Sequence, residues 1–362
     1  MSAARIDRQA AFSGTAEIRA PHRFDAEALA AYLADRIDGF AGPLTVSQFK
    51  GGQSNPTYKL ATPGASYVLR RKPPGRLLPS AHAVEREYRA TAALHPLGFP
   101  VPRPHLLCED TSVIGTAFYV MDFVPGRVFW EPYVPGVTAA ERAAIYDSLN
   151  ATLARLHQVD VAAAGLSDFG RPTGYVQRQI KRWADQYHAS ETDKIAEMDR
   201  LSAFLPTAVP DSGETALVHG DYRLDNCIVA PDGAHIRAVL DWELSTLGDP
   251  IADFTYHLMQ WKMPRSPDGA GVGSLVGHED DAPGLPRLED YVALYCARTG
   301  RDDIPDLDLY LAYNFFRMAA IFQGIVGRVR DGTATNPNAA AIAGQVRPMA
   351  EVAWAFARRA GA

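Results

Sequence analysis

One short segment constrains the fold most, because it interrupts a region that is otherwise helical. From Thr138 to the end the sequence shows mainly helical patterns, but residues 216–240 read as strand, loop and strand. A Pro-Asp-Gly turn at 231–233 separates the apolar runs Cys227–Val229 and His235–Leu240, which predicts a small hairpin. The chain therefore has to fit a hairpin into a helical domain.

The loop of this segment carries polar residues at a spacing that suits phosphoryl transfer. It reads His219-Gly220-Asp221 and continues to Asn226, and Asp241 follows at the end of an apolar strand. Such a transfer needs one carboxylate for the proton of the attacking hydroxyl, and an amide and a second carboxylate to hold Mg²⁺ against a nucleoside triphosphate. The alternative is a set of turn residues around a core histidine, which the complete constellation disfavours.

These motifs resemble the signature of the aminoglycoside phosphotransferase and choline kinase-like branch of the protein-kinase-like fold. The segment from Asp241 through Gly-Asp-Pro to Asp253 is similar to the metal-binding segment of that branch and to the residues directly after it. The resemblance implies that Asp221 is the catalytic base and that Asn226 and Asp241 bind Mg²⁺. It also implies ATP as the phosphate donor and a structural role for His219 in the catalytic loop.

The first third of the chain is rich in strand patterns. Strands are predicted at 44–49, 57–61, 67–71, 105–109 and 116–123, with a short helix after Asp25 and a longer one from Ser80 to Leu94. This predicts an antiparallel sheet with one inserted helix. The expected class is α+β, in a bilobal protein-kinase-like fold with a nucleotide-binding lobe at 1–123 and a helical catalytic and substrate lobe at 124–362.

The turn between the first two of these strands has the composition of a phosphate-binding loop. It contains Gly51, Gly52, Ser54 and Asn55, and its backbone N–H groups could lie over the phosphates of a nucleotide. The alternative is an ordinary hairpin turn built on two glycines.

Further positions follow from the same resemblance. Arg70 stands where kinases carry a lysine on the third strand, and Glu87 matches the glutamate that pairs with it. An arginine still binds phosphate and carboxylate oxygens, and the alternative is a solvated strand end. Met121 and Phe123 lie in a segment that resembles the strand and hinge on which adenine stacks, and otherwise they belong to a buried strand.

Composition excludes several other classes. With 36 basic and 42 acidic residues the net charge is -6, which argues against nucleic acid or an anionic membrane surface as partner. Nothing approaches 18 uninterrupted apolar residues, so we expect no membrane span. Cys108, Cys227 and Cys296 are far apart, which predicts neither disulfides nor a zinc site. Without a signal-like start we expect a cytoplasmic protein, and its oligomeric state stays open.

A narrower resemblance covers nearly the whole chain. The segments 51–58, 69–75, 78–82 and 126–130 are similar to the kinase-like domains associated with acyl-CoA dehydrogenase family members ten and eleven. This implies ATP-dependent phosphorylation of a hydroxyl on a small molecule, such as a hydroxylated acyl-CoA or related acid. Because the sequence stops at Ala362, we expect no flavin-binding dehydrogenase in it. An aminoglycoside, choline or homoserine kinase, or a catalytically weak nucleotide sensor, remain alternatives.

The apolar helix predicted at 306–330 carries one unusual stripe. Asn314, Arg317, Gly324 and Arg328 recur there at helical spacing, and a charged side chain in such a helix needs a partner. Arg317 could pair with a buried carboxylate such as Asp253. Alternatively it faces a cleft under the loop at 263–284 and meets an anionic acceptor.

Overall fold

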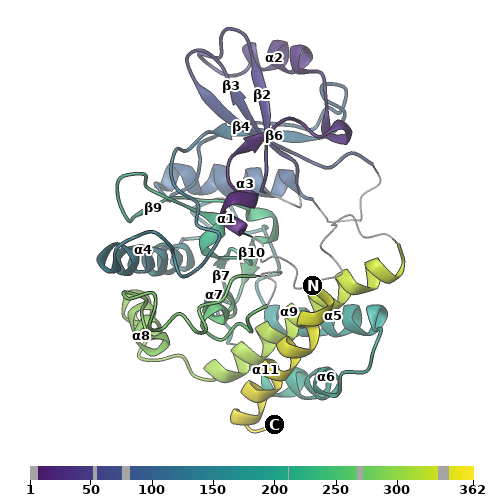
Figure 1. Cartoon of the computed structure of the whole chain (residues 1–362), viewed down its shortest axis with the longest axis vertical. Coiled ribbons are helices and arrows are strands. Elements are labelled where there is room, and N and C mark those ends of the chain that lie inside the picture. Colours follow the sequence, from purple (N-terminus) through teal and green to yellow (C-terminus); the bar gives the residue numbers. More distant parts are fainter. Residues whose placement is uncertain (1–6, 52–54, 76–81, 211, 267–271, 333–341) are drawn as a thin grey trace.

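A computed structural model describes residues 7–51, 55–75, 82–210, 212–266, 272–332 and 342–362. The sheet-rich first part lies above a larger helical part (Figure 1). The first part consists of α1 (Arg8–Phe12), β1 (Thr15–Ala16), α2 (Ala26–Ala34), β2 (Thr45–Phe49), β3 (Thr57–Ala61), β4 (Ser66–Arg71), α3 (Val84–Leu94), β5 (Pro104–Cys108) and β6 (Phe118–Asp122). Its strands form one antiparallel sheet in the order β1-β2-β3-β4-β6-β5.

The two faces of this sheet belong to different cores because successive side chains on a strand point to opposite sides. On β4, Leu69 lies in a cluster with Leu33 of α2. Its neighbour Val68 lies in another cluster with Val84 of α3. Each helix therefore covers one face, and α3 lies on the side toward the helical part (Figure 1).

The second part is helical around two short strand pairs. Its helices are α4 (Ala139–His157), α5 (Tyr175–Ser190), α6 (Ala196–Ala208), α7 (Pro250–Leu258), α8 (Leu288–Thr299), α9 (Leu307–Arg330) and α11 (Val346–Arg359). The strands β7 (Ala216–Val218) and β10 (Thr246–Gly248) pair with each other, and β8 (Cys227–Val229) pairs with β9 (Ile236–Val239). The predicted hairpin is thus present as β8 and β9.

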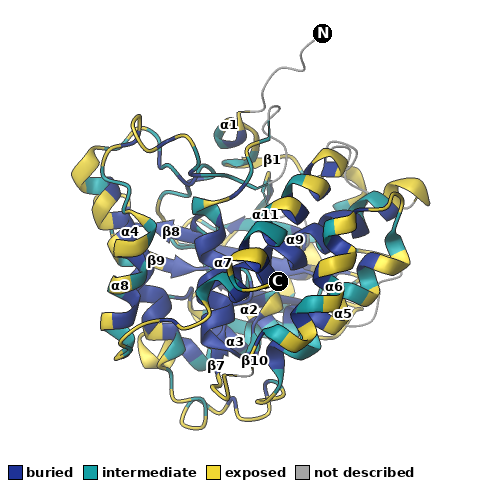
Figure 2. Cartoon of the chain, turned by 90° about the horizontal axis from the view of Figure 1, so that it is seen from below, coloured by how far each residue is buried: buried dark blue, intermediate teal, exposed yellow. Residues whose placement is uncertain are grey.

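The long helix α9 is the centre of the second part. It packs against α5, α7 and α11, and Figure 2 shows it largely buried while α4, α5 and α8 have exposed outer faces. By length and hydropathy α9 could cross a membrane, but 83% of its most apolar window is buried inside the protein. Its apolar composition is accounted for by this packing.

The predicted fold class, α+β with an antiparallel sheet followed by a helical part, is confirmed, and several boundaries are corrected. Asp25 and Thr138 cap helices as predicted. The helix expected from Ser80 begins at Val84, and Ser80 itself lies outside the described residues. The helical pattern at 190–204 predicts a helix that begins at Ser190, but Ser190 is the last residue of α5 and α6 begins only at Ala196. The apolar pattern at 337–358 predicts a last helix, and the structure describes it from Val346 to Arg359.

The sequence prediction lacked the helices α1, α7 and α8. All residues of α7 are buried and the helix is only 9 residues long, so a segment of this kind cannot be told from a buried strand by its pattern alone. Its start was still readable, because Asp249 caps the helix and Pro250 occupies the first turn.

Candidate active site

The loop between β7 and β8 is fixed from α7 through its backbone. The carboxylate of Asp253 accepts hydrogen bonds from the backbone N–H groups of His219 and Gly220, both at 2.8 Å. Gly220 has a φ of 83°, and a Cβ there would lie 2.8 Å from the carbonyl oxygen of Leu244. Only glycine fits this position without strain.

His219 is enclosed by its own neighbours. Its Nε2 lies 2.8 Å from the carbonyl oxygen of Leu240, and its ring centroid is 4.8 Å from that of Trp242. Both contacts join the loop to the segment that carries Asp241. The side chain is completely buried, and these contacts support the structural role expected for it.

Asp221, the residue expected to be the base, receives donors on both carboxylate oxygens. The hydroxyl of Tyr256 donates to Oδ1 at 2.5 Å, and Nε of Arg223 lies 3.0 Å from the same oxygen. The Nδ2 of Asn226 donates to Oδ2 at 3.1 Å. The carboxylate is therefore held in one orientation.

Backbone pairing brings the chain segments of the two expected metal ligands together. The backbone oxygen of Asn226 accepts a hydrogen bond of 2.8 Å from the N–H of Leu240, directly before Asp241. Asp241 follows β9 with a φ of 67°, a left-handed conformation that is uncommon for a residue with a side chain. Hairpin pairing thus joins residues that the sequence separates by the turn at 231–233.

An acidic cluster surrounds Asp241. Carboxylate oxygens of Glu87, Asp241 and Glu243 all lie within 4.8 Å of one another, a donor set that suits a hard divalent cation. No role was expected for Glu243 from the sequence. Its position two residues after Asp241 was the available signal.

Arg70 balances part of this negative charge. Its Nη2 lies 2.9 Å from Oδ1 of Asp241 and 3.3 Å from Oε1 of Glu87. The residue is 6% exposed, so the alternative of a solvated strand end is wrong. Burial lowers the pKa of Arg70, but the carboxylates of Asp241 and Glu87 outweigh it and raise the pKa above its usual range. The guanidinium therefore stays charged.

Glu87 is the most deeply buried member of the cluster. It accepts hydrogen bonds from Nδ2 of Asn55 at 3.0 Å and from the hydroxyl of Tyr119 at 3.1 Å. Burial raises the pKa of Glu87, against the opposing charge of Arg70. Extra positive charge close by would therefore favour its ionised form.

The glycine-bearing turn is described only in part, because Gly52 and Ser54 lie outside the described residues. The Asn55 side chain donates to Glu87 and to Glu243, each at 3.0 Å, so it belongs to the acidic cluster. At Gly51 a Cβ would lie 2.7 Å from the ring of Trp130. Phosphate binding by the backbone of this turn stays a prediction.

The residues expected beside adenine lie on and just after β6. Met121 is buried against α3, and Phe123 packs at the edge of the same cluster. The ammonium group of Lys59 lies 4.5 Å from the centroid of the Phe123 ring. The adenine contact of both residues stays a prediction.

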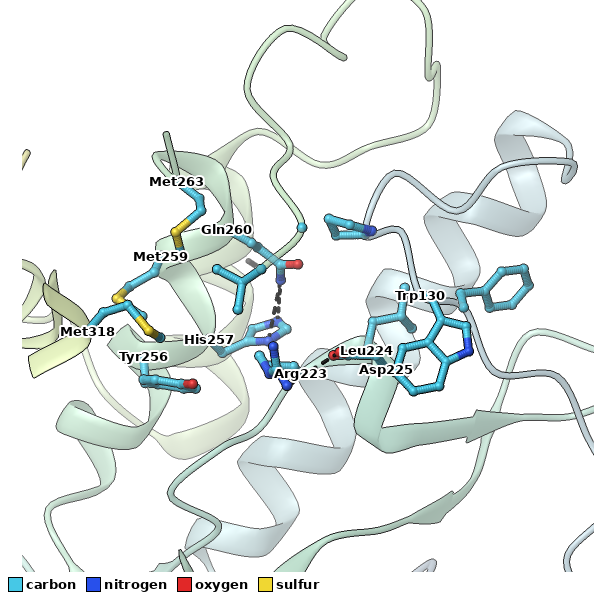
Figure 3. A pocket seen from close by; sticks show the side chains of 14 residues that line it. Trp130, Arg223, Leu224, Asp225, Tyr256, His257, Met259, Gln260, Met263 and Met318 are labelled. Carbon is cyan, nitrogen blue, oxygen red and sulfur yellow. Dashed lines mark hydrogen bonds and ion pairs between the residues drawn. The ribbon is translucent and has the colours of Figure 1, made fainter. Parts of the chain in front are cut away.

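A small cavity adjoins the catalytic loop (Figure 3). It is lined by Phe129, Trp130, Pro132, Arg223, Leu224, Asp225, Tyr256, His257, Met259, Gln260, Met263, Val272, Gly273 and Met318. Methionines form one side, and Trp130 lies opposite them across the polar pair Arg223 and Asp225. The volume is about 30 Å³, so these walls have to move apart for any acceptor larger than water.

Arg317 lies elsewhere than either sequence-based alternative placed it. Its Nη2 donates to the carbonyl oxygen of Gly220 at 2.8 Å, while Asp253 is occupied by the loop backbone and by His157 at 3.2 Å. Pairing of Arg317 with Asp253 is therefore wrong. The residue of α9 that lines the cavity is its neighbour Met318, because adjacent helical residues point about 100° apart. The contact that Arg317 makes is with the catalytic loop, and its expected contact with an acceptor stays a prediction.

Comparison with known proteins agrees with this geometry. The model of the "Phosphotransferase enzyme family" matches residues 45–291. Acyl-CoA dehydrogenase family member 11 of Rattus norvegicus is 43% identical over 351 residues, which are 95% of this chain and 45% of that protein. Acyl-CoA dehydrogenase family member 10 of Mus musculus is 43% identical over 351 residues, with coverages of 96% and 32%. The chain spans less than half the length of these relatives.

Solved structures show the same relationship. A Ralstonia eutropha protein named as a candidate aminoglycoside phosphotransferase matches with a TM-score of 0.82 and 49% identity, covering 93% of this chain and 99% of that one. Two more distant structures share the fold. An aminoglycoside phosphotransferase matches with a TM-score of 0.58 and 15% identity, covering 91% of this chain and 99% of that one. The choline kinase of Cryptosporidium parvum matches with a TM-score of 0.60 and 10% identity, covering 93% of this chain and 95% of that one. This chain, with its protein-kinase-like fold, belongs to the phosphotransferase enzyme family.

Proposed function

We propose that the protein transfers the γ-phosphate of ATP to a hydroxyl group of a small molecule, with hydroxylated acyl-CoA esters or related acids as the leading acceptor class. One observation carries the proposal. The Asp221 carboxylate accepts a hydrogen bond from the side chain of Asn226. The backbone oxygen of Asn226 accepts a hydrogen bond from the N–H of Leu240, the residue directly before Asp241. A base and the oxygen ligands for Mg²⁺ are thus adjacent, as phosphoryl transfer requires.

The residues present fit a magnesium–nucleotide complex. Asp241 and Glu243 offer carboxylate oxygens, and Asn226 uses its Nδ2 for Asp221, so its amide oxygen is the atom left for a metal. The buried Nε of Arg70 has no hydrogen-bond partner among the described residues and could donate to a phosphate. When bound, Mg²⁺ would neutralise charge on the phosphate oxygens.

The chain's own residues then divide the work of the transfer. Asp221 accepts the hydroxyl proton while the oxygen of the acceptor bonds to the γ-phosphorus and the bond to the leaving ADP breaks. Arg70, which Glu87 orients, holds phosphate oxygens. The buried contacts of His219 and Asp253 keep the loop in place.

The walls of the cavity support the acceptor class. Met259, Met263 and Met318 form a flexible apolar surface that suits an acyl chain. Arg223, at the end of the cavity near Asp221, suits an anionic group better than a polycation. The relatives named as acyl-CoA dehydrogenases agree with this class, whereas the aminoglycoside phosphotransferase of known structure holds AMP-PNP and hygromycin B.

One contact favours a second candidate, a nucleotide sensor that turns over slowly. The Nη2 of Arg70 is 2.9 Å from Asp241, so the cation and a bound Mg²⁺ would compete for one carboxylate. A sensor of this kind would bind ATP with little production of ADP.

A screen of acceptors decides between these possibilities. The protein is incubated with ATP, Mg²⁺ and separate pools of hydroxyacyl-CoAs, aminoglycosides, choline and homoserine, and ADP is measured. We expect ADP to rise with the hydroxyacyl-CoA pool. Stimulation by another pool alone would reassign the acceptor, and ATP binding without stimulation by any pool would favour the sensor.

A further inference from the structure

One face of α7 holds three consecutive residues of the catalytic loop. Asp253 accepts from the backbone N–H groups of His219 and Gly220, and Tyr256 donates to the Asp221 carboxylate. Positions three residues apart lie on the same side of a helix. The helix therefore fixes the backbone of the loop with one residue and the side chain of the expected base with the next on that face.

The two oxygens of the Asp221 carboxylate differ in their surroundings. Among the described residues, Oδ1 receives the Tyr256 hydroxyl at 2.5 Å and has Nε of Arg223 at 3.0 Å. The other oxygen, Oδ2, accepts from Nδ2 of Asn226 at 3.1 Å, and from no other group in the part of the chain that the structure describes. Nε of Arg223 is an ion-pair neighbour of Oδ1 and not a hydrogen-bond donor to it. Oδ1 is thus held by the tyrosine hydroxyl and faces a cation, whereas Oδ2 has room for a further donor.

From this difference we propose that Tyr256 is a positioning residue, which holds Oδ1 of Asp221 and thereby presents Oδ2 to the hydroxyl of the acceptor. This inference rests on the proposed function and names the atom that takes the proton. Tyr256 also lines the cavity beside the loop, where Figure 3 shows it between Arg223 and the methionine side. The tyrosine therefore stands between the acceptor space and the base.

The hydroxyl of Tyr256 is a dependable donor. Burial raises the pKa of Tyr256 far above its usual range, and the negative charge of Asp221 acts in the same direction. The hydroxyl thus keeps its proton over the whole working range of an enzyme. A donor that never ionises can hold the carboxylate at every pH.

Arg317 holds the tyrosine from the other side. Its guanidinium carbon lies 4.8 Å from the centroid of the Tyr256 ring, and its Nη2 donates to the carbonyl oxygen of Gly220 at 2.8 Å. The side chain is 6% exposed. A cation over the ring and a bond to the adjacent peptide together fix Tyr256 against the loop, so Arg317 acts through Tyr256 and Gly220.

The test is a set of variants assayed with ATP, Mg²⁺ and the hydroxyacyl-CoA pool. Tyr256→Phe removes only the hydroxyl, and we expect kcat to fall about tenfold or more, the typical effect of a hydrogen bond to a charged group, with the KM for ATP unchanged. In an Asp221→Ala background the same change should have almost no effect, because the partner is already gone. An equal loss in both backgrounds, or an unchanged kcat, would overturn the proposal.

Tyr310→Phe is the matched control. This buried hydroxyl also donates to an aspartate, Oδ2 of Asp249 at 2.9 Å, but at the start of α7. We expect a similar loss of thermal stability and a wild-type kcat. If it lowered kcat as much as Tyr256→Phe does, a general loosening of α7 would explain both results, and the positioning role would be lost.

Two further measurements keep the inference independent of folding and of the acceptor. If Tyr256→Phe does not fold, Arg317→Gln is assayed in its place, with the same expected fall in kcat at constant KM for ATP, and a wild-type kcat counts against the proposal. If the wild-type protein phosphorylates nothing in the pool, the proposed function has failed. The contact between Tyr256 and Asp221 is then tested by the free energies of urea unfolding of the wild type, the Tyr256→Phe and Asp221→Ala variants, and the double variant. If the double variant loses less stability than the sum of the two single variants, the hydrogen bond between Tyr256 and Asp221 is supported. If the losses of the single variants simply add, the bond is overturned.

Discussion

Arg70 is the residue at which this chain departs from the lysine of kinases, and its contacts show how an arginine is accommodated there. It meets Asp241 and Glu87 with a single Nη2 at 2.9 and 3.3 Å. The planar group still has other N–H donors. One of these, Nε, is buried without a partner among the described residues.

Replacing Arg70 therefore has graded consequences. Arg70→Ala should leave the buried Glu87 carboxylate uncompensated and cost about 3–5 kcal/mol of stability, and it should abolish stabilisation by ATP. Arg70→Lys keeps a charge and should retain that stabilisation in part. Thermal melts with and without ATP and Mg²⁺ measure the stability of each variant and its stabilisation by ATP.

Arg89→Ala, which breaks an ion pair with Asp168 at a largely exposed site, is the control with a small effect. Equal behaviour of the two Arg70 variants would remove Arg70 from the nucleotide site.

His257 gives the fold a defined sensitivity to acid. Burial lowers the pKa of His257 from 6.5 to about 4, so between these pH values the unfolded chain binds a proton that the folded protein does not. Stability is therefore complete above pH 6.5 and falls as the pH drops toward 4, by roughly 3 kcal/mol from this residue. In urea unfolding, His257→Gln should lose less stability over this range than the wild type. The exposed His188→Gln should match the wild type, and a slope unchanged by His257→Gln would contradict the assignment.

At the scale of elements, residues 7–16 form an N-terminal strap across both parts of the protein. Gln9 donates to the carbonyl of Val128 at 2.9 Å and accepts from the N–H of Trp130 at 3.2 Å. Phe12 packs on the Trp130 ring at 5.1 Å, and β1 pairs with β2 at the edge of the sheet. Since Trp130 lines the cavity, the strap supports one of its walls.

Loosening the N-terminal strap should therefore affect the acceptor more than ATP. Phe12→Ala should raise the acceptor KM about fivefold, as expected for the loss of an aromatic contact, with little change in the KM for ATP. Phe24→Ala is the matched control, because Phe24 is also half-buried and packs on Tyr58 at 5.0 Å, away from the cavity. Steady-state kinetics measure both constants. A parallel rise in both KM values with Phe12→Ala would mean that the N-terminal strap acts on the whole site.

Elements whose hydrophobic period or caps are visible could be predicted from the sequence. The strands β4 and β6 and the helix capped by Thr138 belong to this group. The helix α7 does not, because it is short and buried all round, and such a segment reads equally well as a buried strand. Because α7 is not predicted, the sequence does not show that Asp253 lies on a helix beside the catalytic loop. The sequence therefore suggests Arg317 as its partner, whereas Asp253 binds the loop backbone.

At the scale of the whole molecule, the site is assembled from both parts of the chain. Arg70 and Asp241, which are 171 positions apart, form a hydrogen bond, and Asn55 reaches Glu243 across 188 positions. The spacing of a motif indicates which residues lie close together in one short segment. Which side chains from distant segments meet depends on tertiary packing, which the spacing does not show. This is why the sequence could group Asp221, Asn226 and Asp241 around one hairpin. It could not show that Glu243, Tyr256 and Arg317 lie beside them.

Since residues from both parts of the chain meet at the expected metal site, substitutions there should weaken the stabilisation of the whole protein by ATP and Mg²⁺. Asn226→Ala and Asp241→Ala should each remove most of the magnesium-dependent stabilisation by ATP, because phosphate charge is left uncompensated. The shift in melting temperature with ATP, measured with and without Mg²⁺, tests this. Asp185→Ala, which breaks an exposed ion pair with Lys181, should keep the full shift. A full shift in the Asp241 variant would place the metal elsewhere.

Phosphorus NMR of a reaction with ATP, Mg²⁺ and the hydroxyacyl-CoA pool tests the proposed phosphoryl transfer most directly, because it follows the γ-phosphate itself. We predict that a phosphomonoester signal grows as ATP is converted to ADP. Asp221→Asn should slow that growth at least about a hundredfold, the typical contribution of a positioned base, while ATP affinity stays within a few-fold. An Asp221→Asn protein that forms the phosphomonoester at the wild-type rate would contradict the proposed mechanism.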